Sequence, residues 1–420
     1  MERNTNRVEF TKEMKKTYKI LFPNMADIHF RILGHVFEHY GYDVELLTNT
    51  DSSVIQEGLK YVHNDTCYPA LLTIGQMISA LKSGKYDVNH TAVMMSQSGG
   101  GCRASNYIHL LRKALKNAGL EQVPTISINL SGLEKNSGFT ITLPMILKAV
   151  AALVYGDLLM LLSNQTRPYE VNKGETDALV AKWVEEISNQ FIANKGYFRG
   201  ALKRNMKEIL DSFEKIEIQK VPKVKVGIVG EIYVKYSALA NNNLEKFLAS
   251  QDCEVMVPGI LAFFLFKVDN RLEDIKLYGG NPFKKIACRF LYHYLENFES
   301  DLLEVLGTTK RYTVPSTYAH LKNLVKPAIG YGCKMGEGWL LTAEMMELIE
   351  SGYGNIVCAQ PFGCLPNHIV GKGMIRKLQE LYPTSNVVAI DYDAGATKVN
   401  QENRIKLMIA VAKENMSKTE

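Results

Sequence analysis

The 420-residue sequence lacks the signals of several special classes of protein. Its 49 basic and 44 acidic residues leave a formal net charge of only +5, and the excess is scattered along the chain. Nucleic-acid-binding proteins usually show a concentrated basic face, so we expect no nucleic-acid partner. Residues 1–16 are polar and lack the apolar core of a signal peptide, which predicts a cytoplasmic protein.

A long uninterrupted apolar stretch is also missing. The most apolar segment covers residues 146–162, but Lys148, Gly156 and Asp157 interrupt it. A membrane-spanning helix needs about 20 predominantly apolar residues. We therefore interpret this segment as two buried pieces of a soluble domain and expect no membrane partner.

Common cofactor motifs are missing as well. The sequence has no C-x-x-C pair and no metal-type histidine pair, which makes a zinc site a poor match. It has no G-x-x-x-x-G-K-[ST] motif, and Gly227 and Gly230 are spaced wrongly for G-x-G-x-x-G. The chain therefore shows no obvious nucleotide site of its own.

The content that is present is typical of a soluble α/β protein. Hydrophobic residues make up 46% and charged residues 22%. Strand-like segments alternate with helix-like ones, which predicts parallel βαβ units. We expect two tandem Rossmann-like or flavodoxin-like parallel-sheet lobes, at residues 1–170 and 221–420. A helical connector at 171–220 joins them, and a helical insertion at 260–325 interrupts the second lobe.

The predicted elements follow this plan in detail. In the first lobe, strands are expected at 18–22, 44–47, 91–96 and 125–130, and helices at 28–40, 53–61, 70–81 and 105–118. In the second lobe, strands are expected at 224–229, 254–257, 328–331, 355–359 and 387–391, and helices at 242–249, 338–351, 368–381 and 401–412.

The sequence has seven cysteines. Disulfides are unusual in a reducing cytoplasm, so each thiol is interpreted either as a core residue or as a metal ligand. Open parallel sheets bind ligands beyond the carboxyl ends of their strands. Cys102 and Cys333 follow predicted strands closely, Cys358 and Cys364 bracket the exit of the strand at 355–359, and Cys67 can reach the same side. Cys253 and Cys288 have contexts typical of core filler, at a strand start and within an apolar helix.

The neighbours of these cysteines suit an anionic ligand. Gly100 and Gly101, with Gly99, let the backbone come close to a bulky group, and a helix follows whose N-terminus attracts negative charge. Arg103, Glu231 and Asn367 are expected to tune the site through charge and hydrogen bonds. Widely separated cysteines on strand-exit loops favour an iron–sulfur cluster between the lobes.

At these motifs the chain resembles a known family. The blocks NDTCYPALLTIGQ, SQSGGGCRASNYI, CKMGEGWLLTAEM, CAQPFGCLPNHIVGKGM and AIDYDAGATKVNQENRIKLM are similar to the dehydratase-type module of the 2-hydroxyacyl-CoA dehydratase and benzoyl-CoA reductase system. The resemblance runs from about residue 17 to 412 and is strongest to a branch similar to the double-cubane cluster proteins.

The resemblance implies a cysteine-ligated cluster in the cleft, electrons from a separate ATP-hydrolysing iron–sulfur activator, and a homodimer. It assigns Cys67, Cys102, Cys358 and Cys364 as ligands, with Cys333 as a fifth. A double-cubane 8Fe–9S cluster needs six thiolates, and only Cys288 or Cys253 remains as the sixth. A single 4Fe–4S cluster fits the count as well.

Three functions stay open at this point. The first is an enzyme, a reductase that passes low-potential electrons from the activator to a small-molecule substrate. The second is a 2-hydroxyacyl-CoA dehydratase subunit, a lyase with a 4Fe–4S cluster. The third is an electron carrier without catalysis. The sequence identifies neither the substrate nor any catalytic side chain.

Overall fold

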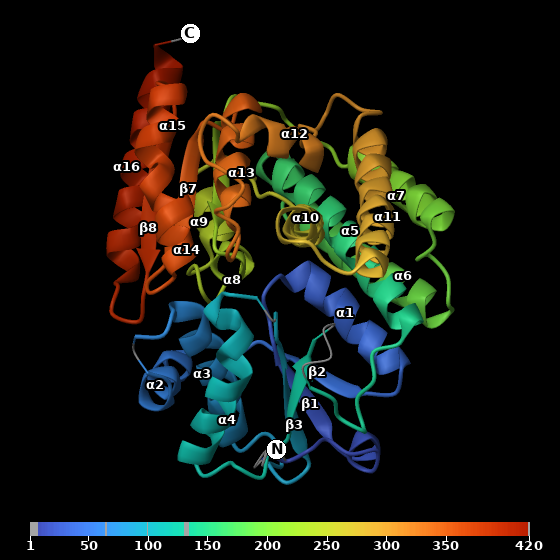
Figure 1. Ribbon diagram of the computed structural model, residues 1–420. Coiled ribbons are helices and arrows are strands. Elements are labelled where there is room, and N and C mark those ends of the chain that lie inside the picture. The colour runs from blue at the N-terminus through green and yellow to red at the C-terminus, as the bar shows by residue number, and fades with distance from the viewer. Residues whose placement is uncertain (1–6, 64, 99, 130–133, 419–420) are drawn as a thin grey trace.

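The computed structural model describes residues 7–63, 65–98, 100–129 and 134–418. It confirms an α/β fold with two four-stranded parallel sheets. In Figure 1 the first lobe lies below, the second lobe lies at the upper left, and a group of helices lies at the upper right.

The first lobe has the strand order β2-β1-β3-β4, with every neighbouring pair parallel. Its strands are β1 (Lys19–Pro23), β2 (Asp43–Leu47), β3 (Thr91–Ser96) and β4 (Thr125–Ile128). Its helices are α1 (Asp27–His39), α2 (Ser52–Tyr61), α3 (Tyr68–Lys82) and α4 (Tyr107–Asn117), with short 3₁₀ turns η1 (Met14–Lys16) and η2 (Arg103–Asn106).

The second lobe repeats the same order as β6-β5-β7-β8. Its strands are β5 (Val224–Gly230), β6 (Cys253–Met256), β7 (Asn355–Pro361) and β8 (Asn386–Tyr392). Its helices are α8 (Ile232–Tyr236), α9 (Leu244–Ser250), α13 (Trp339–Glu350), α14 (Leu365–Val370), α15 (Ile375–Leu381) and α16 (Lys398–Ser417), with η4 (Lys372–Met374).

The strand order that the two sheets share determines which loops are candidates for ligand binding. In each sheet the chain starts in a central strand, moves outward to one side, and then crosses to the other side. The switch points therefore lie between β1 and β3 and between β5 and β7. Ligands of open α/β sheets bind outside the carboxyl ends of the strands at such points.

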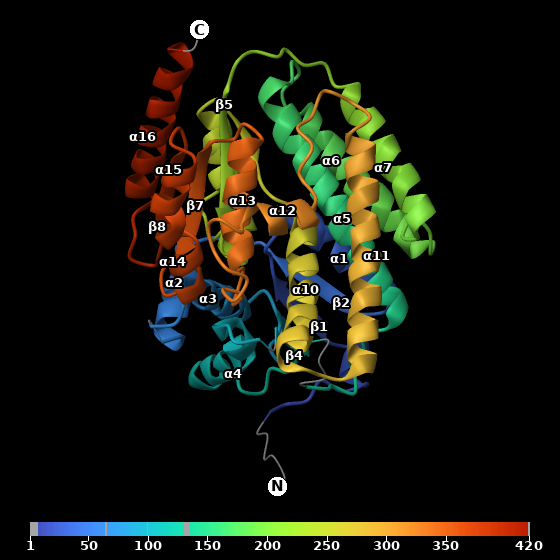
Figure 2. The same ribbon diagram turned by 45° about the horizontal axis from the view of Figure 1, so that its top comes forward.

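The remaining helices form a layer beside the two sheets (Figures 1 and 2). They are α5 (Leu143–Thr166), α6 (Glu175–Ile192), α7 (Arg199–Glu214), α10 (Ile260–Tyr278), α11 (Pro282–Leu306) and α12 (Tyr318–Leu324), with η3 (Arg167–Tyr169). The connector and the insertion are thus helical, as predicted, and both pack against α5 in one apolar core.

Helix α5 corrects one expectation. The apolar segment at 146–162 is one continuous helix, because each residue that interrupts the apolar pattern is accommodated. Buried Lys148 donates to the carbonyl oxygen of Phe191 at 2.7 Å and to Asn194 Oδ1 at 2.9 Å. At Gly156 the missing side chain leaves room for the ring of His29, which a Cβ would approach to 2.2 Å.

Length and composition alone would allow α5 to cross a membrane, yet 78% of its most apolar window is buried inside the protein. Asp157 fixes the helix within this core. Its carboxylate accepts the backbone N–H groups of Ile260 and Leu261 at 2.7 and 2.9 Å, and it lies 2.9 Å from His29 Nε2. One side chain thereby joins α1, α5 and α10, as in the core of a soluble protein.

The strand expected at 328–331 is absent, and this prediction is wrong. The segment instead turns around the end of α12, where the N–H groups of Ala328 and Ile329 both bond to the Val325 carbonyl. Tyr331 packs its ring 5.2 Å from that of Trp339. Its apolar residues therefore cover a helix and do not pair with a strand.

Elsewhere the predicted elements agree with the structure apart from their ends. The sequence did not predict the short helix α8 or the 3₁₀ segments η1 and η3, and it predicted one helix at 368–381 where the structure has three short segments. Gly371 marks the break, since a Cβ there would lie 2.7 Å from the Asn367 carbonyl oxygen.

Candidate metal centre

The carboxyl ends of the two sheets meet at the junction of the lobes. The backbone N–H of Tyr68, at the start of α3, donates to the carbonyl of Phe362 at 3.1 Å. Gly363 packs so closely that a Cβ would lie 3.1 Å from Cys67 Cα. The loop before α3 and the loop after β7 therefore form one structure, although they lie far apart in the sequence.

A second loop pair completes the junction. At Gly101 a Cβ would lie 2.7 Å from the sulfur of Met335, so the loop after β3 touches the loop before α13. The Lys267 ammonium donates to the carbonyl of Gly336 in that loop. The helical insertion, the first lobe and the second lobe all reach this place.

Three cysteines occupy equivalent positions around the junction. Cys67, Cys102 and Cys364 each precede a helical segment, as the N-cap residues of α3, η2 and α14. Pro69 and Pro366 follow two of them within the first helical turn, where the fixed φ of proline suits a helix start. The local sequence thus turns each thiol toward the open end of a helix.

The three thiols share one environment. Cys67 and Cys364 pack together with Ala70 and the ring of Tyr107, whose hydroxyl lies 2.7 Å from Cys67 Sγ. Cys102 is close enough to Cys67 to affect its pKa electrostatically, and Cys67 affects that of Cys364 in turn. The structure therefore brings these three predicted ligands together.

Burial raises the pKa of all three thiols. Desolvation is the largest cause in each, and it raises the pKa of Cys67 to about 11. Opposing this, the backbone N–H groups of Ala70, Ala104 and Asn367 lower the pKa of Cys67, Cys102 and Cys364 respectively. Each helix start therefore offers one backbone N–H that can stabilise a thiolate. Burial, however, keeps the free thiols protonated.

Two carboxylates stand beside the thiols. Glu231 follows β5 and caps α8 by accepting the N–H of Val234 at 2.9 Å. Glu337 precedes α13 and accepts the N–H of Ile232 at 3.0 Å. Desolvation raises the pKa of Glu231, and the charge of Glu337 raises it further. Glu231 also raises the pKa of each of the three cysteines.

One cation faces this negative group. Lys267 lies on α10 with its ammonium 4.7 and 5.1 Å from the ring centres of Phe263 and Phe266. Burial lowers its pKa, whereas Glu337 and Cys102 raise it. The helical insertion thus supplies a lysine to a site that also holds the carboxylates of Glu231 and Glu337.

The other two predicted ligands lie apart from this trio. Cys333 is exposed, on the loop that replaces the expected strand at 328–331. Cys358 lies inside β7, which continues to Pro361, and is fully buried. Its surroundings include Gly371, Glu344 and Asp391. Strand β7 ends two residues later than predicted, so Cys358, which was expected beside the strand exit, lies further inside the strand.

The predicted tuning residues are dispersed around the trio. Gly100 has open space where a Cβ would stand, whereas Gly101 is confined by Met335, and Gly99 lies outside the described residues. Arg103 donates to the carbonyl of Asp65 at 2.5 Å and so ties the Cys102 loop to the Cys67 loop. Asn367 is fully buried, and neither polar atom of its side chain has a hydrogen-bond partner among the described residues.

Cys253 and Cys288 lie away from the junction. Cys253 opens β6, at the amino end of the sheet, and is fully buried. Cys288 lies on α11, half-buried. These positions agree with the interpretation of both residues as structural.

Sequence reasoning missed two members of the site. Tyr107 is an ordinary aromatic of α4 in the sequence, and Lys267 is one of many lysines. Only the packing of α4 and α10 brings them to the cysteines. Glu337 belongs to the block CKMGEGWLLTAEM, close to Cys333 in the sequence, but nothing in the sequence indicates that it lies near Glu231.

Within the described part of the chain, no group of three or more His, Cys, Asp or Glu side chains is arranged to hold a single metal ion. The ligands of a cluster bind different iron atoms, so they need not converge on one point. Three thiols from separate helix starts, those of Cys67 and Cys364 buried and that of Cys102 half-buried, fit such a group by the chemistry of their donors.

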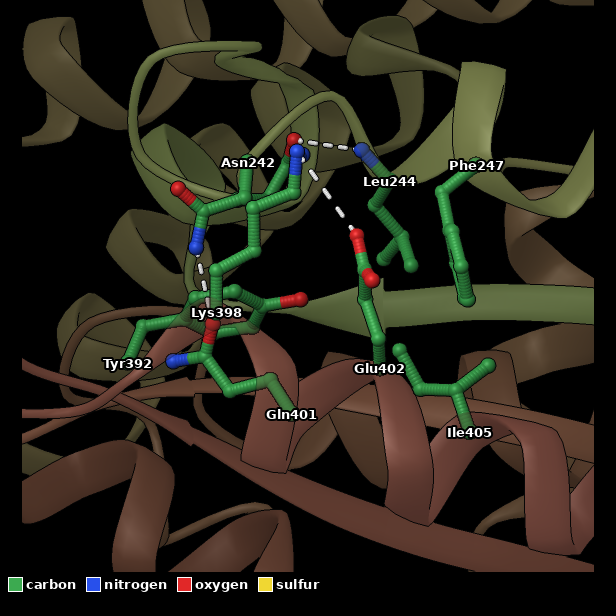
Figure 3. A pocket seen from close by; sticks show the side chains of 9 residues that line it. Asn242, Leu244, Phe247, Tyr392, Lys398, Gln401, Glu402 and Ile405 are labelled. Atoms are coloured by element: carbon green, nitrogen blue, oxygen red, sulfur yellow. Dashed lines mark hydrogen bonds and ion pairs between the residues drawn. The ribbon is translucent and has the colours of Figure 1, made fainter.

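Two hollows lie elsewhere. Figure 3 shows the smaller, about 10 Å³, where the amide of Asn242 on the chain before α9 bonds to Gln401 on α16 at 2.7 Å. That volume holds at most a single water molecule. The larger, about 250 Å³, lies in the first lobe beside Lys15, Tyr42 and Thr140. Neither includes a cysteine.

Comparison with known proteins adds no relative. A scan against protein-family models finds no match. A search of curated proteins finds no significant match either. The resemblance to the 2-hydroxyacyl-CoA dehydratase and benzoyl-CoA reductase system therefore stays a prediction from the sequence blocks.

Proposed function

We propose that the chain is a cytoplasmic iron–sulfur protein whose cluster is held by Cys67, Cys102 and Cys364. The supporting observation is the gathering of these three thiols, two buried and one half-buried, each at the start of a helical segment, near the carboxylates of Glu231 and Glu337. Thiolates are the usual ligands of iron–sulfur clusters. Cys333, on the adjoining loop, is the candidate for a further ligand.

The protonation of the site fits metal binding. Thiols that are kept protonated by burial must release their protons to become ligands. The N–H groups at the three helix starts then favour the thiolates, since they already lower the pKa of each sulfur. The Tyr107 hydroxyl can donate to Cys67, and Lys267 offsets part of the added negative charge.

In this proposal the protein is a reductase. A bound cluster supplies one-electron transfer, and the low-potential electrons come from an ATP-hydrolysing iron–sulfur activator. The chain's own residues bind the cluster, exclude water from it, and hold protons on Glu231 and Tyr107 close to it. The acceptor is a small molecule.

A second candidate is a 2-hydroxyacyl-CoA dehydratase subunit. It is favoured because three cysteine thiols gather at the site. A four-iron cluster with three protein thiolates leaves one iron for another ligand. The separation of Cys358 from the trio supports a single 4Fe–4S cluster over a double cubane, which needs six thiolates.

The test is iron and acid-labile sulfide per chain, on protein purified without oxygen. About four irons per chain would support a single cubane, and about eight would require Cys333, Cys358 and another cysteine as ligands. Turnover of a 2-hydroxyacyl-CoA with a reduced activator would identify the dehydratase. Essentially no iron after anaerobic reconstitution would overturn the proposal.

A further inference from the structure

The larger hollow, of about 250 Å³, lies at the amino end of the first sheet, beside the segments that lead into β1, β2 and α5. We call it the basic hollow. Its lining includes Lys12, Lys15, Tyr40, Tyr42, Thr140 and Thr142. Pockets for drug-sized ligands usually measure about 300–1,000 Å³, so this hollow suits a smaller molecule.

The lining of the basic hollow is positively charged. It contains two lysines and no acidic residue. Lys12 is exposed and Lys15 is half-buried, and neither forms an ion pair with any residue that the structure describes. A hollow lined by charge of one sign concentrates ligands of the opposite sign. Its charge therefore favours an anion.

Two acidic side chains close in sequence to these lysines lie outside the lining and interact with other groups. Glu9 Oε1 accepts the backbone N–H of Ser137 at 2.7 Å. The side chain of Thr11 is the largest cause that lowers the pKa of Glu13, and the charge of Lys12 contributes less. Neither carboxylate therefore occupies the place of an anionic ligand.

Contacts with the wall of the hollow hold Lys15 in position. Its ammonium donates to the carbonyl oxygen of Tyr40 at 2.9 Å and lies 4.0 Å from the centre of the Tyr42 ring. The Tyr42 hydroxyl in turn accepts the backbone N–H of Thr140 at 3.0 Å. A lysine ammonium has three N–H donors, and within the described part of the chain only one of them is used. The other donors are available to a ligand.

The two walls of the basic hollow are fastened to each other. The backbone N–H of Gly138 donates to the carbonyl of Phe10 at 2.9 Å, and the N–H of Phe10 donates to Asn136 Oδ1 at 3.3 Å. At Gly138 a Cβ would lie only 2.0 Å from the carbonyl oxygen of Thr11, so only glycine allows this close approach. The loop before α5 and the segment before β1 therefore form one preorganised site, which lowers the entropic cost of binding.

A buried cation adjoins the hollow. The ammonium of Lys148, on α5, lies 5.1 Å from the centre of the Tyr40 ring. Its hydrogen bonds go to two uncharged acceptors, the Phe191 carbonyl and the Asn194 side chain, and no described carboxylate pairs with it. A buried charge without a counter-charge is costly, and an anion in the hollow would offset part of that cost. The positive end of the α5 dipole, which begins after Thr142, acts in the same direction.

We propose that the basic hollow binds the phosphate group of a small organic molecule. This inference is independent of the proposed function. A phosphate monoester carries a charge of about −1.5 to −2 at neutral pH, which matches two lysines better than the single charge of a carboxylate does. Lysine binds phosphate as a point charge. The rings of Tyr40 and Tyr42 and the side chain of Met145 offer apolar surface to the organic part of the ligand.

The position of the hollow separates this ligand from the redox site. Lys15 precedes β1 and Tyr42 precedes β2, at the amino ends of these strands, whereas Cys102 follows the carboxyl end of β3. All these strands are parallel, so the hollow and the cysteine lie at opposite ends of the sheet. The phosphorylated ligand is therefore distinct from the molecule that a cluster would reduce.

The test is isothermal titration calorimetry of the intact protein, purified without oxygen, with phenyl phosphate at constant ionic strength. The wild type should show saturable binding. Lys15→Gln and Lys12→Gln should each weaken this binding by about tenfold, because each removes a charged hydrogen-bond donor. Lys16→Gln is the matched control, since this neighbouring lysine is exposed and does not line the hollow, and its affinity should equal that of the wild type.

Benzoate tests the choice of phosphate, because it keeps the aromatic ring and replaces the phosphate by a carboxylate. It should bind the wild type about tenfold more weakly than phenyl phosphate or less well still, since it carries about half the charge. Circular dichroism should show unchanged folding of the variants, because Lys12 and Lys16 are exposed and Lys15 is half-buried. No saturable binding of phenyl phosphate, an equal loss of affinity in Lys16→Gln, or equally tight binding of benzoate would overturn the proposal.

Discussion

The hydroxyl of Tyr107 lies 2.7 Å from the sulfur of Cys67, and these two residues come from the starts of two different helices. Burial raises the pKa of this hydroxyl well above its ordinary value, and the neighbouring Cys67 adds to the shift. Tyr107 therefore keeps its proton and can donate it in a hydrogen bond to a thiolate. It adds a side-chain donor to the backbone N–H of Ala70 at this sulfur.

This contact predicts a change in redox potential. Hydrogen bonds to ligand sulfurs stabilise the reduced cluster, so Tyr107→Phe should make the potential more negative, by on the order of tens of millivolts. Iron content should stay unchanged. A redox titration followed by electron paramagnetic resonance measures the potential that relates the oxidised and reduced cluster. Tyr382→Phe, which removes a hydroxyl bonded to Glu350 away from the junction, is the matched control. Equal potentials in all three proteins would count against the donor role.

The arrangement of the cysteines predicts which of them hold iron. Cys364→Ser and Cys102→Ser should lose most of the iron from anaerobically purified protein, because each removes one of three thiols in a shared site. Cys253→Ser should keep it, since Cys253 lies at the opposite end of the second sheet.

Cys358 distinguishes the two cluster types. Its position inside β7 predicts that Cys358→Ser keeps its iron, in contrast to the sequence blocks, which assign this residue as a ligand. Iron loss in Cys358→Ser together with about eight irons in the wild type would favour the double cubane. Iron and sulfide analysis of the variants, prepared side by side, decides the matter.

Asp157 predicts a large cost to stability. Asp157→Ala removes the acceptor for two buried N–H groups and for His29, which should lower the free energy of unfolding by about 3 kcal/mol. Urea denaturation followed by circular dichroism measures the shift in midpoint. Asp177→Ala breaks an exposed pair with Arg167 and should cost less than about 1 kcal/mol. A similar loss of unfolding free energy in both variants would contradict the role of Asp157 in joining α1, α5 and α10.

Glu299 predicts a dependence of stability on pH. Desolvation raises its pKa from 4.5 to about 7, while the N–H of Tyr318, 2.8 Å away, opposes the shift. The folded state then holds this proton more tightly than the unfolded state. Its contribution is fully present below about pH 4.5 and is lost as pH rises toward 7, by up to about 3 kcal/mol.

Glu299→Gln should remove that loss. The amide keeps an oxygen for the Tyr318 N–H but carries no charge, so the variant should exceed the wild type in stability at pH 8 and match it near pH 4.5. Urea midpoints at the two pH values measure the difference. Glu414→Gln, on the exposed end of α16, is the control and should follow the wild type. A Glu299→Gln curve parallel to the wild type would contradict the assignment.

Much of the fold could be predicted because its segments carry local signals. The strand at 91–96 was predicted with its observed ends, since apolar β-branched and methionine residues form a short run between turn residues. The segment at 328–331 has a similar apolar character, yet it covers Trp339. A short apolar run indicates that a segment is buried, but not whether it pairs with another strand. No local signal distinguishes the segment at 91–96 from the one at 328–331 in this respect.

The candidate site was predictable only in part. Cys67, Cys102 and Cys364 precede helices in the sequence, and their gathering followed from the topology of parallel sheets. Tyr107 and Lys267 reach the junction through the packing of α4 and α10, which depends on contacts distant in sequence. The strand that contains Cys358 was predicted to end two residues too early, so this cysteine was expected beside the strand exit and lies instead in the core.

The positions of Cys67, Cys102 and Cys364 in the sequence determine when a complete cluster site can form. Cys67 and Cys102 are synthesised before Cys364, and the loop of Cys364 contacts the first lobe through the bond between the Tyr68 N–H and the Phe362 carbonyl. A cluster that needs all three thiols can form only after Cys364 has been synthesised and the two lobes have met. In that folded state the raised pKa of each thiol keeps it protonated and slow to oxidise before iron binds.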